Sequence, residues 1–96
     1  SGAPMSEPTF DEFTAQSLEE GFDEVLVREW QADIVLDTHT HPFDASVRVV
    51  RGNYSLTVGD EVRQLQAGDT FRLARNVPHA EHYGPEGATI WVARAN

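Results

Sequence analysis

The four histidines of this 96-residue chain lie in two pairs, and their spacing is typical of ligands to a metal ion. His39 and His41 stand two residues apart between segments rich in β-branched residues, which favour an extended strand. Alternate residues of a strand point to the same face, so we expect the two imidazoles to reach one point in space. His79 and His82 follow a turn-like segment further along. The chain has no cysteine, so a transition-metal site must use imidazole and carboxylate ligands.

Strand-like segments separated by turn residues make up most of the chain and must position these histidines. By alternation and β-branched content we expect strands at 22–30, 34–41, 45–51, 54–58, 61–65, 70–74, 79–83 and 88–94. Glycine-containing turns are expected between them at 52–53, 59–60, 68–69 and 84–87. About eight short strands in this arrangement predict an antiparallel sandwich or barrel.

The N-terminal residues have a different pattern. Thr9 is a candidate helix cap with Glu12 as its capping-box partner, and the apolar positions that follow are sparse. We therefore expect at most a short helix or an irregular arm over residues 5–21. Residues 1–4 look like the remnant of an expression tag, and residues 22–96 are expected to form a single β domain.

The histidine segments resemble the two sequence motifs of the cupin superfamily. The first motif runs G-x5-H-x-H-x(3,4)-E-x6-G, and the second runs G-x5-P-x-G-x2-H-x3-N. The spacing of this chain agrees with them at His39, His41, Gly52, Gly68 and His79. The resemblance covers residues 39–83. It implies a single-domain, all-β jelly-roll barrel with a divalent metal in its mouth, held by three histidines and a carboxylate.

The chain departs from these motifs at the acidic ligand. Ala45 occupies that position and has no donor atom, so the fourth ligand of the family type is missing there. Ala74, Asn76 and Tyr83 replace the Pro, Gly and Asn of the second motif, but those positions shape turns. Only the change at position 45 alters the chemistry of the site.

Several residues near the histidines are candidates to complete the site. Glu81 is in phase with His79 and either replaces the missing acidic ligand, orients a histidine ring, or remains solvated. Asp44 reaches the site only if a bulge shifts the register of its strand. His82 has the opposite phase, which favours a surface position over ligation. The Tyr83 hydroxyl either contacts a bound ligand or lies at the edge of the core.

An apolar pocket is expected around the metal. Residues in phase with His41 are predicted to line it, and these are Phe43, Ala45, Val47, Val49 and Arg51. Arg51 either meets a substrate carboxylate or lies beyond the barrel rim, paired with an acid.

Three neutral imidazoles leave a divalent metal with its full charge and with open positions for a bidentate anionic ligand. Fe(II), Zn(II), Ni(II), Mn(II) and Cu(II) all suit such ligands. The first functional hypothesis is an enzyme acting on a small organic acid or dicarbonyl, either as a dioxygenase or as an isomerase or lyase with Glu81 as base. The alternatives are a non-catalytic cupin module that binds or senses a small ligand, and a structural metal.

Composition limits the choice of partners. Sixteen acidic and seven basic residues give a net charge of −9, which repels nucleic acids and anionic membrane surfaces. No apolar run has the length of a membrane span or a signal-peptide core, so we expect a soluble, cytoplasmic protein. We also expect a homodimer, with Trp30 and Trp91 as candidates for its interface, because exposed sheet edges need cover.

Overall fold

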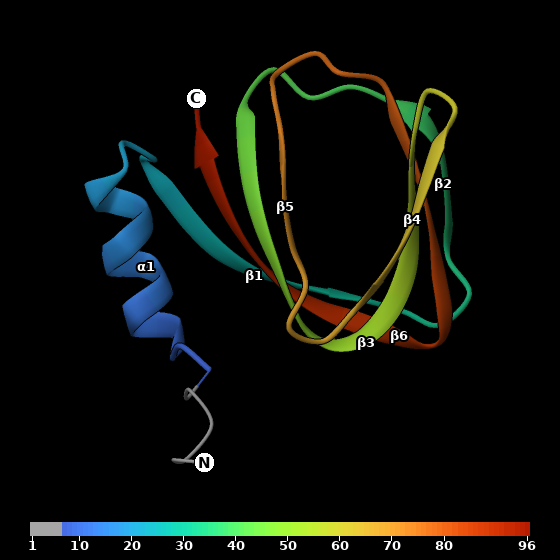
Figure 1. Cartoon of the computed structure of the whole chain (residues 1–96), viewed down its shortest axis with the longest axis horizontal. Helices are drawn as coiled ribbons and strands as arrows, with labels where there is room; N and C mark the ends of the chain where they lie inside the picture. Colours follow the sequence, from blue (N-terminus) through green and yellow to red (C-terminus); the bar gives the residue numbers. More distant parts are fainter. Residues whose placement is uncertain (1–6) are drawn as a thin grey trace.

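The computed structural model describes residues 7–96 and shows one helix followed by a β-barrel (Figure 1). The elements are α1 (Phe10–Glu19), β1 (Glu24–Trp30), β2 (Val35–His39), β3 (Asp44–Val58), β4 (Glu61–Gln66), β5 (Thr70–Leu73) and β6 (His79–Ala95). The predicted tag remnant at residues 1–4 and the start of the predicted arm lie outside the described residues.

Two long strands, β3 and β6, run through both walls of the barrel. The first half of β3 and the second half of β6 form one wall, in the order β1, β6, β3, β5. The second half of β3 and the first half of β6 form the other wall, in the order β2, β6, β3, β4. All of these pairings are antiparallel. The structure therefore confirms the predicted all-β jelly-roll barrel, with six strands in place of about eight because two of them serve both walls.

Two of the predicted turns are bends within continuous strands. The chain does not reverse at 52–53 or at 84–87, where β3 and β6 continue through irregularities in their register. Gly52 has φ +79°, and a Cβ atom built on it would lie 2.0 Å from the carbonyl oxygen of Gly87. Glycine is therefore required here because two backbones meet closely at a barrel corner, where a bulge bends the strands.

The helix begins as the sequence predicts. The Thr9 hydroxyl accepts a hydrogen bond from the Glu12 N–H (3.1 Å), and the Glu12 carboxylate accepts one from the Thr9 N–H (2.8 Å). Phe10 and Phe13 pack on Trp91, with ring centroids 5.5 and 5.7 Å apart. The helix thus lies against the outside of the wall that contains β1 (Figure 1). Its ten residues are too few to cross a bilayer, and no other helix occurs between residues 7 and 96.

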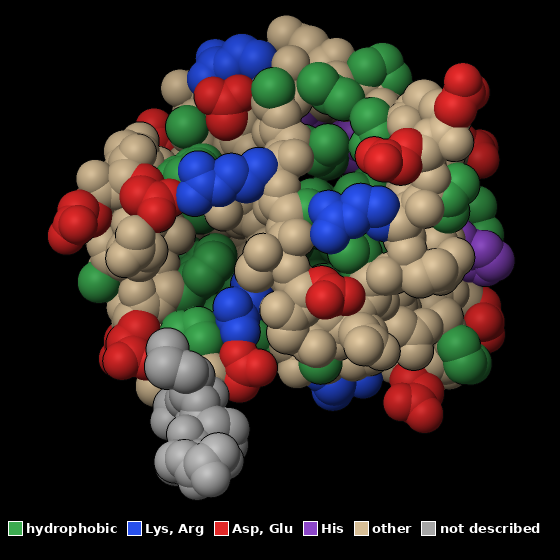
Figure 2. All heavy atoms as spheres, in the orientation of Figure 1, with side chains coloured by type: hydrophobic (Ala, Val, Ile, Leu, Met, Phe, Trp, Pro, Cys, Tyr) green, Lys and Arg blue, Asp and Glu red, His purple; other side chains and the backbone are tan. Residues whose placement is uncertain are grey.

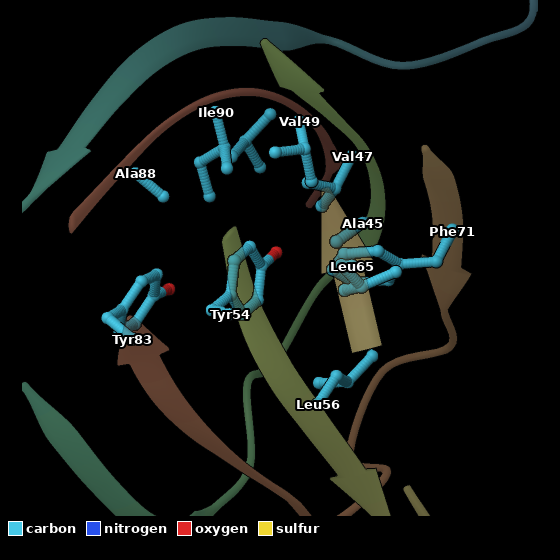
Figure 3. Packing of buried hydrophobic residues seen from close by; sticks show 11 residues of the cluster. Ala45, Val47, Val49, Tyr54, Leu56, Leu65, Phe71, Tyr83, Ala88 and Ile90 are labelled. Carbon is cyan, nitrogen blue, oxygen red and sulfur yellow. The ribbon is translucent and has the colours of Figure 1, made fainter. Parts of the chain in front are cut away.

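A stack of three aromatic rings lies inside the barrel. The Tyr54 and Tyr83 rings are 4.5 Å apart and lie side by side in Figure 3, and Trp30 stacks on Tyr83 at 5.0 Å. Trp30 and Trp91 are therefore both engaged within the chain, and their predicted place in a dimer interface stays a prediction. The homodimer itself stays a prediction.

The corner between β3 and β6 can be tested with a matched pair of glycine substitutions. Gly52→Ala should lower the free energy of unfolding by on the order of 3 kcal/mol or more, because the new methyl group clashes with backbone. Gly59→Ala is the control: Gly59 also has positive φ but has no atom within 4 Å of a built Cβ, so its cost should be about 1 kcal/mol. Urea denaturation followed by circular dichroism measures both, and equal losses would contradict the corner's role.

The two tyrosines predict a distinctive response to alkali. Burial raises the pKa of Tyr54 and Tyr83 well above the ordinary value of about 10, and the Glu81 charge raises both further. Because the folded state holds these protons more tightly than the unfolded state, stability is unaffected below pH ~10 and falls as the pH rises above it. Tyrosinate absorbance at alkaline pH should therefore appear only together with loss of the folded circular dichroism spectrum. Ionisation of either tyrosine in the folded chain near pH 10 would contradict this.

Candidate metal centre

Three histidines from separate segments meet at one end of the barrel. His39 ends β2, His79 begins β6 and is its partner in the β2–β6 ladder, and His41 lies in the segment before β3. Their ring centroids are 4.4 to 4.9 Å apart, and one ligand nitrogen from each lies within 4.8 Å of the others. The cluster could hold a metal ion. The prediction that one strand carries both His39 and His41 is wrong, because β2 ends at His39.

Backbone carbonyls fix the tautomers of two of these rings. His39 Nδ1 lies 2.8 Å from the Asp37 carbonyl oxygen, and His79 Nδ1 lies 2.9 Å from the Val77 carbonyl oxygen. A carbonyl oxygen can only accept a hydrogen bond, so each Nδ1 must carry a proton, and in the neutral ring each Nε2 then presents its lone pair. Such carbonyl partners orient metal-binding histidines in general. Both rings are therefore set for ligation through Nε2.

The backbone of His41, the third histidine, is held by the loop that precedes β6. Its carbonyl oxygen accepts a hydrogen bond from the N–H of Asn76 (2.7 Å). Asn76 has φ +65°, a conformation that asparagine tolerates better than most residues, which explains how it replaces the glycine of the second motif. Burial lowers the pKa of His41, and the neighbouring His79 and His39 lower it further, which favours the neutral imidazole that a metal requires.

The carboxylate of Glu81 lies directly beside this cluster. Its Oε2 is 3.4 Å from His39 Nε2 and 3.7 Å from His79 Nε2, and its side chain is 11% exposed. Its other oxygen, Oε1, accepts a hydrogen bond of 2.6 Å from the Tyr83 hydroxyl. Lone pairs on two imidazoles thus face a carboxylate oxygen, an arrangement that becomes favourable when a cation lies among them. The residues present therefore fit a divalent transition metal.

Two of the other candidates lie away from the cluster. Asp44 forms an ion pair with Arg75, whose backbone N–H also donates to it at 2.8 Å. The hydrogen bond from that N–H, with the Arg75 guanidinium, lowers the pKa of Asp44. His82 is exposed and is not part of the histidine cluster. The structure therefore brings Glu81 to the histidines and the Tyr83 hydroxyl to Glu81, but not Asp44 or His82 to the cluster.

A cavity of about 120 Å³ opens beside the histidines, and its walls correct part of the predicted lining. Phe43, Ala45 and Val47 line it as expected. Val49 and Arg51 do not: Val49 is fully buried in the core, and Arg51 is exposed and donates to the Glu86 carbonyl oxygen. A register shift between Val49 and Arg51 breaks the alternation from which the inward position of Arg51 was predicted.

Sequence reasoning missed two arginines in the cavity wall, Arg28 and Arg94. The alternation of inward-facing and outward-facing residues along β1 and β6 could have identified them. Arg28 is in phase with Leu26 and Trp30, and Arg94 is in phase with Val92, all of which face the inside of the barrel. A charged residue on an otherwise apolar strand face therefore marked each of these positions.

Comparison with known proteins places this chain in a family. A model of the Cupin domain family matches residues 28–92, so the chain belongs to that family. A comparison with curated proteins gives no match.

Solved structures show the same fold at low sequence identity. KdgF from Halomonas sp. is 22% identical, with a TM-score of 0.64, over 75% of this chain and 67% of that one. A cupin-2 domain containing protein from Shewanella frigidimarina is 19% identical, with a TM-score of 0.63, over 75% and 69%. The DMSP lyase DddQ from Ruegeria pomeroyi is 20% identical, with a TM-score of 0.68, over 75% of this chain but 37% of that one. These similarities extend to the fold alone.

The histidine cluster predicts a definite metal content. Protein loaded with Zn(II) and dialysed should retain about one ion per chain, and His79→Ala should retain almost none, because a buried ligand is lost and its partners cannot compensate. His82→Ala is the matched control and should behave as the wild type. Elemental analysis measures all three, and equal metal content in the His79→Ala and wild-type proteins would refute the site.

Proposed function

We propose that this protein is a metal-dependent cupin enzyme that acts on a small organic acid or dicarbonyl as an isomerase or lyase. His39, His41 and His79 hold a divalent transition metal, and Glu81 is the general base. The observation that carries the proposal is the position of the Glu81 carboxylate, with one oxygen beside the histidine Nε2 atoms and the other held by Tyr83.

Separate roles for the metal and for Glu81 follow from this geometry. A bound divalent metal would supply Lewis acidity, which polarises a carbonyl oxygen. Glu81 takes a proton from the carbon next to that carbonyl, and the electron pair of the broken C–H bond moves toward the carbonyl. An isomerase returns the proton at another atom of the substrate, whereas a lyase expels a leaving group from the neighbouring carbon.

Tyr83 acts as the positioning residue for this base. Its raised pKa keeps the phenol protonated throughout the neutral range, so it always donates to Glu81 Oε1. That hydrogen bond orients the carboxylate and leaves Oε2 directed at the histidines. A carboxylate fixed in this way loses little conformational freedom when it meets a substrate.

Glu81 has a second possible role, as a metal ligand that replaces the acid missing at position 45. Its Oε2 lies on the same side as the histidine Nε2 atoms, which supports this role as well. A dioxygenase remains the other enzymatic candidate, for which Glu81 would complete the set of residues that hold the metal. The two roles are separable because a ligand affects metal retention and a base does not.

The fold itself is compatible with lyase chemistry. DddQ is described as a DMSP lyase and has the same fold, which supports the proposal in general terms. The substrate must be small, because the cavity of about 120 Å³ is well below the range of roughly 300–1,000 Å³ found for drug-sized ligands.

Proton exchange tests the role of Glu81 directly. Zn(II)-loaded wild-type protein in D₂O should accelerate exchange of the carbon-bound protons in at least one of a panel of small 2-oxo acids and 1,3-dicarbonyls, followed by NMR. Glu81→Gln should reduce that exchange by about 10²–10⁴-fold, because the amide cannot accept the proton, while the metal content stays at the wild-type level.

Glu61→Gln serves as the control, because Glu61 is exposed on β4 and its loss should change neither quantity. Loss of metal from Glu81→Gln would assign Glu81 to the ligand set. If no member of the panel exchanges while saturable ligand binding persists, the non-catalytic binding module becomes the better description. The mainly apolar wall of the cavity, with Leu36, Leu56 and Phe71, favours that second candidate.

A further inference from the structure

Two guanidinium groups in the cavity wall have little to bind within the protein. Arg28 on β1 lies with its Cζ 4.8 Å from the centroid of the Trp30 ring, and Arg94 on β6 lies with its Cζ 4.4 Å from that of Phe43. Each cation therefore rests on an aromatic ring that also lines the cavity. A guanidinium stacked in this way keeps the N–H groups of its edge free for hydrogen bonding.

Most of the N–H donors of these two arginines have no acceptor among the residues that the structure describes. The Arg94 guanidinium donates one hydrogen bond among residues 7–96, from Nη1 to Glu24 at 3.5 Å, and its Nε is buried without a partner. Arg28 makes no hydrogen bond or ion pair with any residue between 7 and 96. Each guanidinium carries five N–H donors, so most of this capacity remains available to an acceptor-rich ligand.

The remaining arginines of the chain are well paired. Arg48, Arg72 and Arg75 form ion pairs with Glu7, Glu20 and Asp44, and Arg51 and Arg63 donate to backbone carbonyl oxygens. The chain has sixteen acidic residues for seven arginines, and Asp and Glu side chains are spread over the face shown in Figure 2. Acidic partners are therefore abundant, yet among residues 7–96 Arg28 has no acidic partner at all and Arg94 has only the contact of 3.5 Å with Glu24, and both of these arginines line the cavity.

Arg94 also stands where the charge of the site departs from the family pattern. It is the cross-strand partner of Ala45, the position at which the cupin motif has an acidic ligand. The position that carries an acidic ligand in the cupin motif thus lies beside a positively charged arginine in this chain. The residues that line the cavity include two guanidiniums but only one carboxylate, that of Glu81. The lining is therefore positively charged within a strongly acidic protein.

We propose that Arg28 and Arg94 bind carboxylate groups of the substrate, so that this cavity selects a small organic acid with two carboxylates. The inference rests on the proposed function for the identity of the site, and it narrows the substrate from any small acid or dicarbonyl to a dicarboxylate. Paired N–H donors of arginine match the two oxygens of a carboxylate, and charge-assisted hydrogen bonds of this kind are the strong ones.

Calorimetric binding of malonate to the full chain, both metal-free and Zn(II)-loaded, tests the assignment. The wild-type protein should bind malonate saturably, and Arg94→Gln and Arg28→Gln should each weaken binding at least tenfold. Arg94→Lys should fall between Arg94→Gln and wild type, because it keeps the charge and loses the paired donors. Arg72→Gln removes the same charge from an exposed position and should change the affinity less than twofold. Uncharged malonamide should not bind.

The outcomes separate this inference from the proposed function. If Arg94→Gln and Arg28→Gln bind malonate as the wild type does, or if the wild type binds none, the dicarboxylate assignment is overturned, whatever the metal content. If the arginine variants lose malonate binding in the metal-free protein while Zn(II) retention and Glu81-dependent exchange fail in the wild type, the anion site stands and the proposed enzyme does not. Circular dichroism of each variant shows whether a loss of binding reflects the site or the fold.

Discussion

The contact between the backbones of β3 and β6 at Gly52 and Gly87 determines how this molecule is built. Each strand passes from one wall of the barrel to the other, and their backbones approach closely at the bend because Gly52 has no side chain. Gly87 has none for another reason, since a Cβ atom there would meet the backbone of Trp30 and Gln31. That shared bend carries the first residues of β6 into the second wall, beside β2. His79 thereby comes opposite His39 and Glu81 opposite Leu36, with the Glu81 carboxylate 3.4 Å from His39 Nε2, so the arrangement of the site depends on this corner.

The charged residues that line the cavity have the opposite net sign to the whole chain. The chain is strongly acidic overall, but the cavity has three imidazoles, two guanidiniums and a single carboxylate among its lining residues. Such a cavity attracts anions that the exterior repels, and the low-dielectric aromatic and aliphatic walls strengthen that attraction. Alanine at position 45 is consistent with this positive lining, because a carboxylate there would lie beside Arg94 and neutralise its charge.

The sequence predicted the fold because its signals were local and redundant. Strand alternation, glycine turns, the capping box at Thr9 and the histidine spacing all indicated the architecture that the structure shows. The errors arose where contacts between distant segments determine the local structure. Glycine at 52 has the same signal whether it reverses a chain or allows two strands to touch, and one register shift moved Arg51 out of the predicted lining. Position within a strand identified Glu81 and Tyr83, but which of its roles Glu81 takes depends on distances that sequence does not contain.

The hydrogen bonds from His39 and His79 to the carbonyl oxygens two residues before them have a consequence for metal exchange. Both rings are already oriented by the backbone, so one ion can replace another without reorganising the barrel. A rigid set of imidazoles ranks the divalent ions by their intrinsic affinities, which rise from manganese to copper. If the cluster holds a metal, the ion it carries would then depend on cellular supply, and the reactivity of the same folded chain would differ between cells that differ in their metal pools.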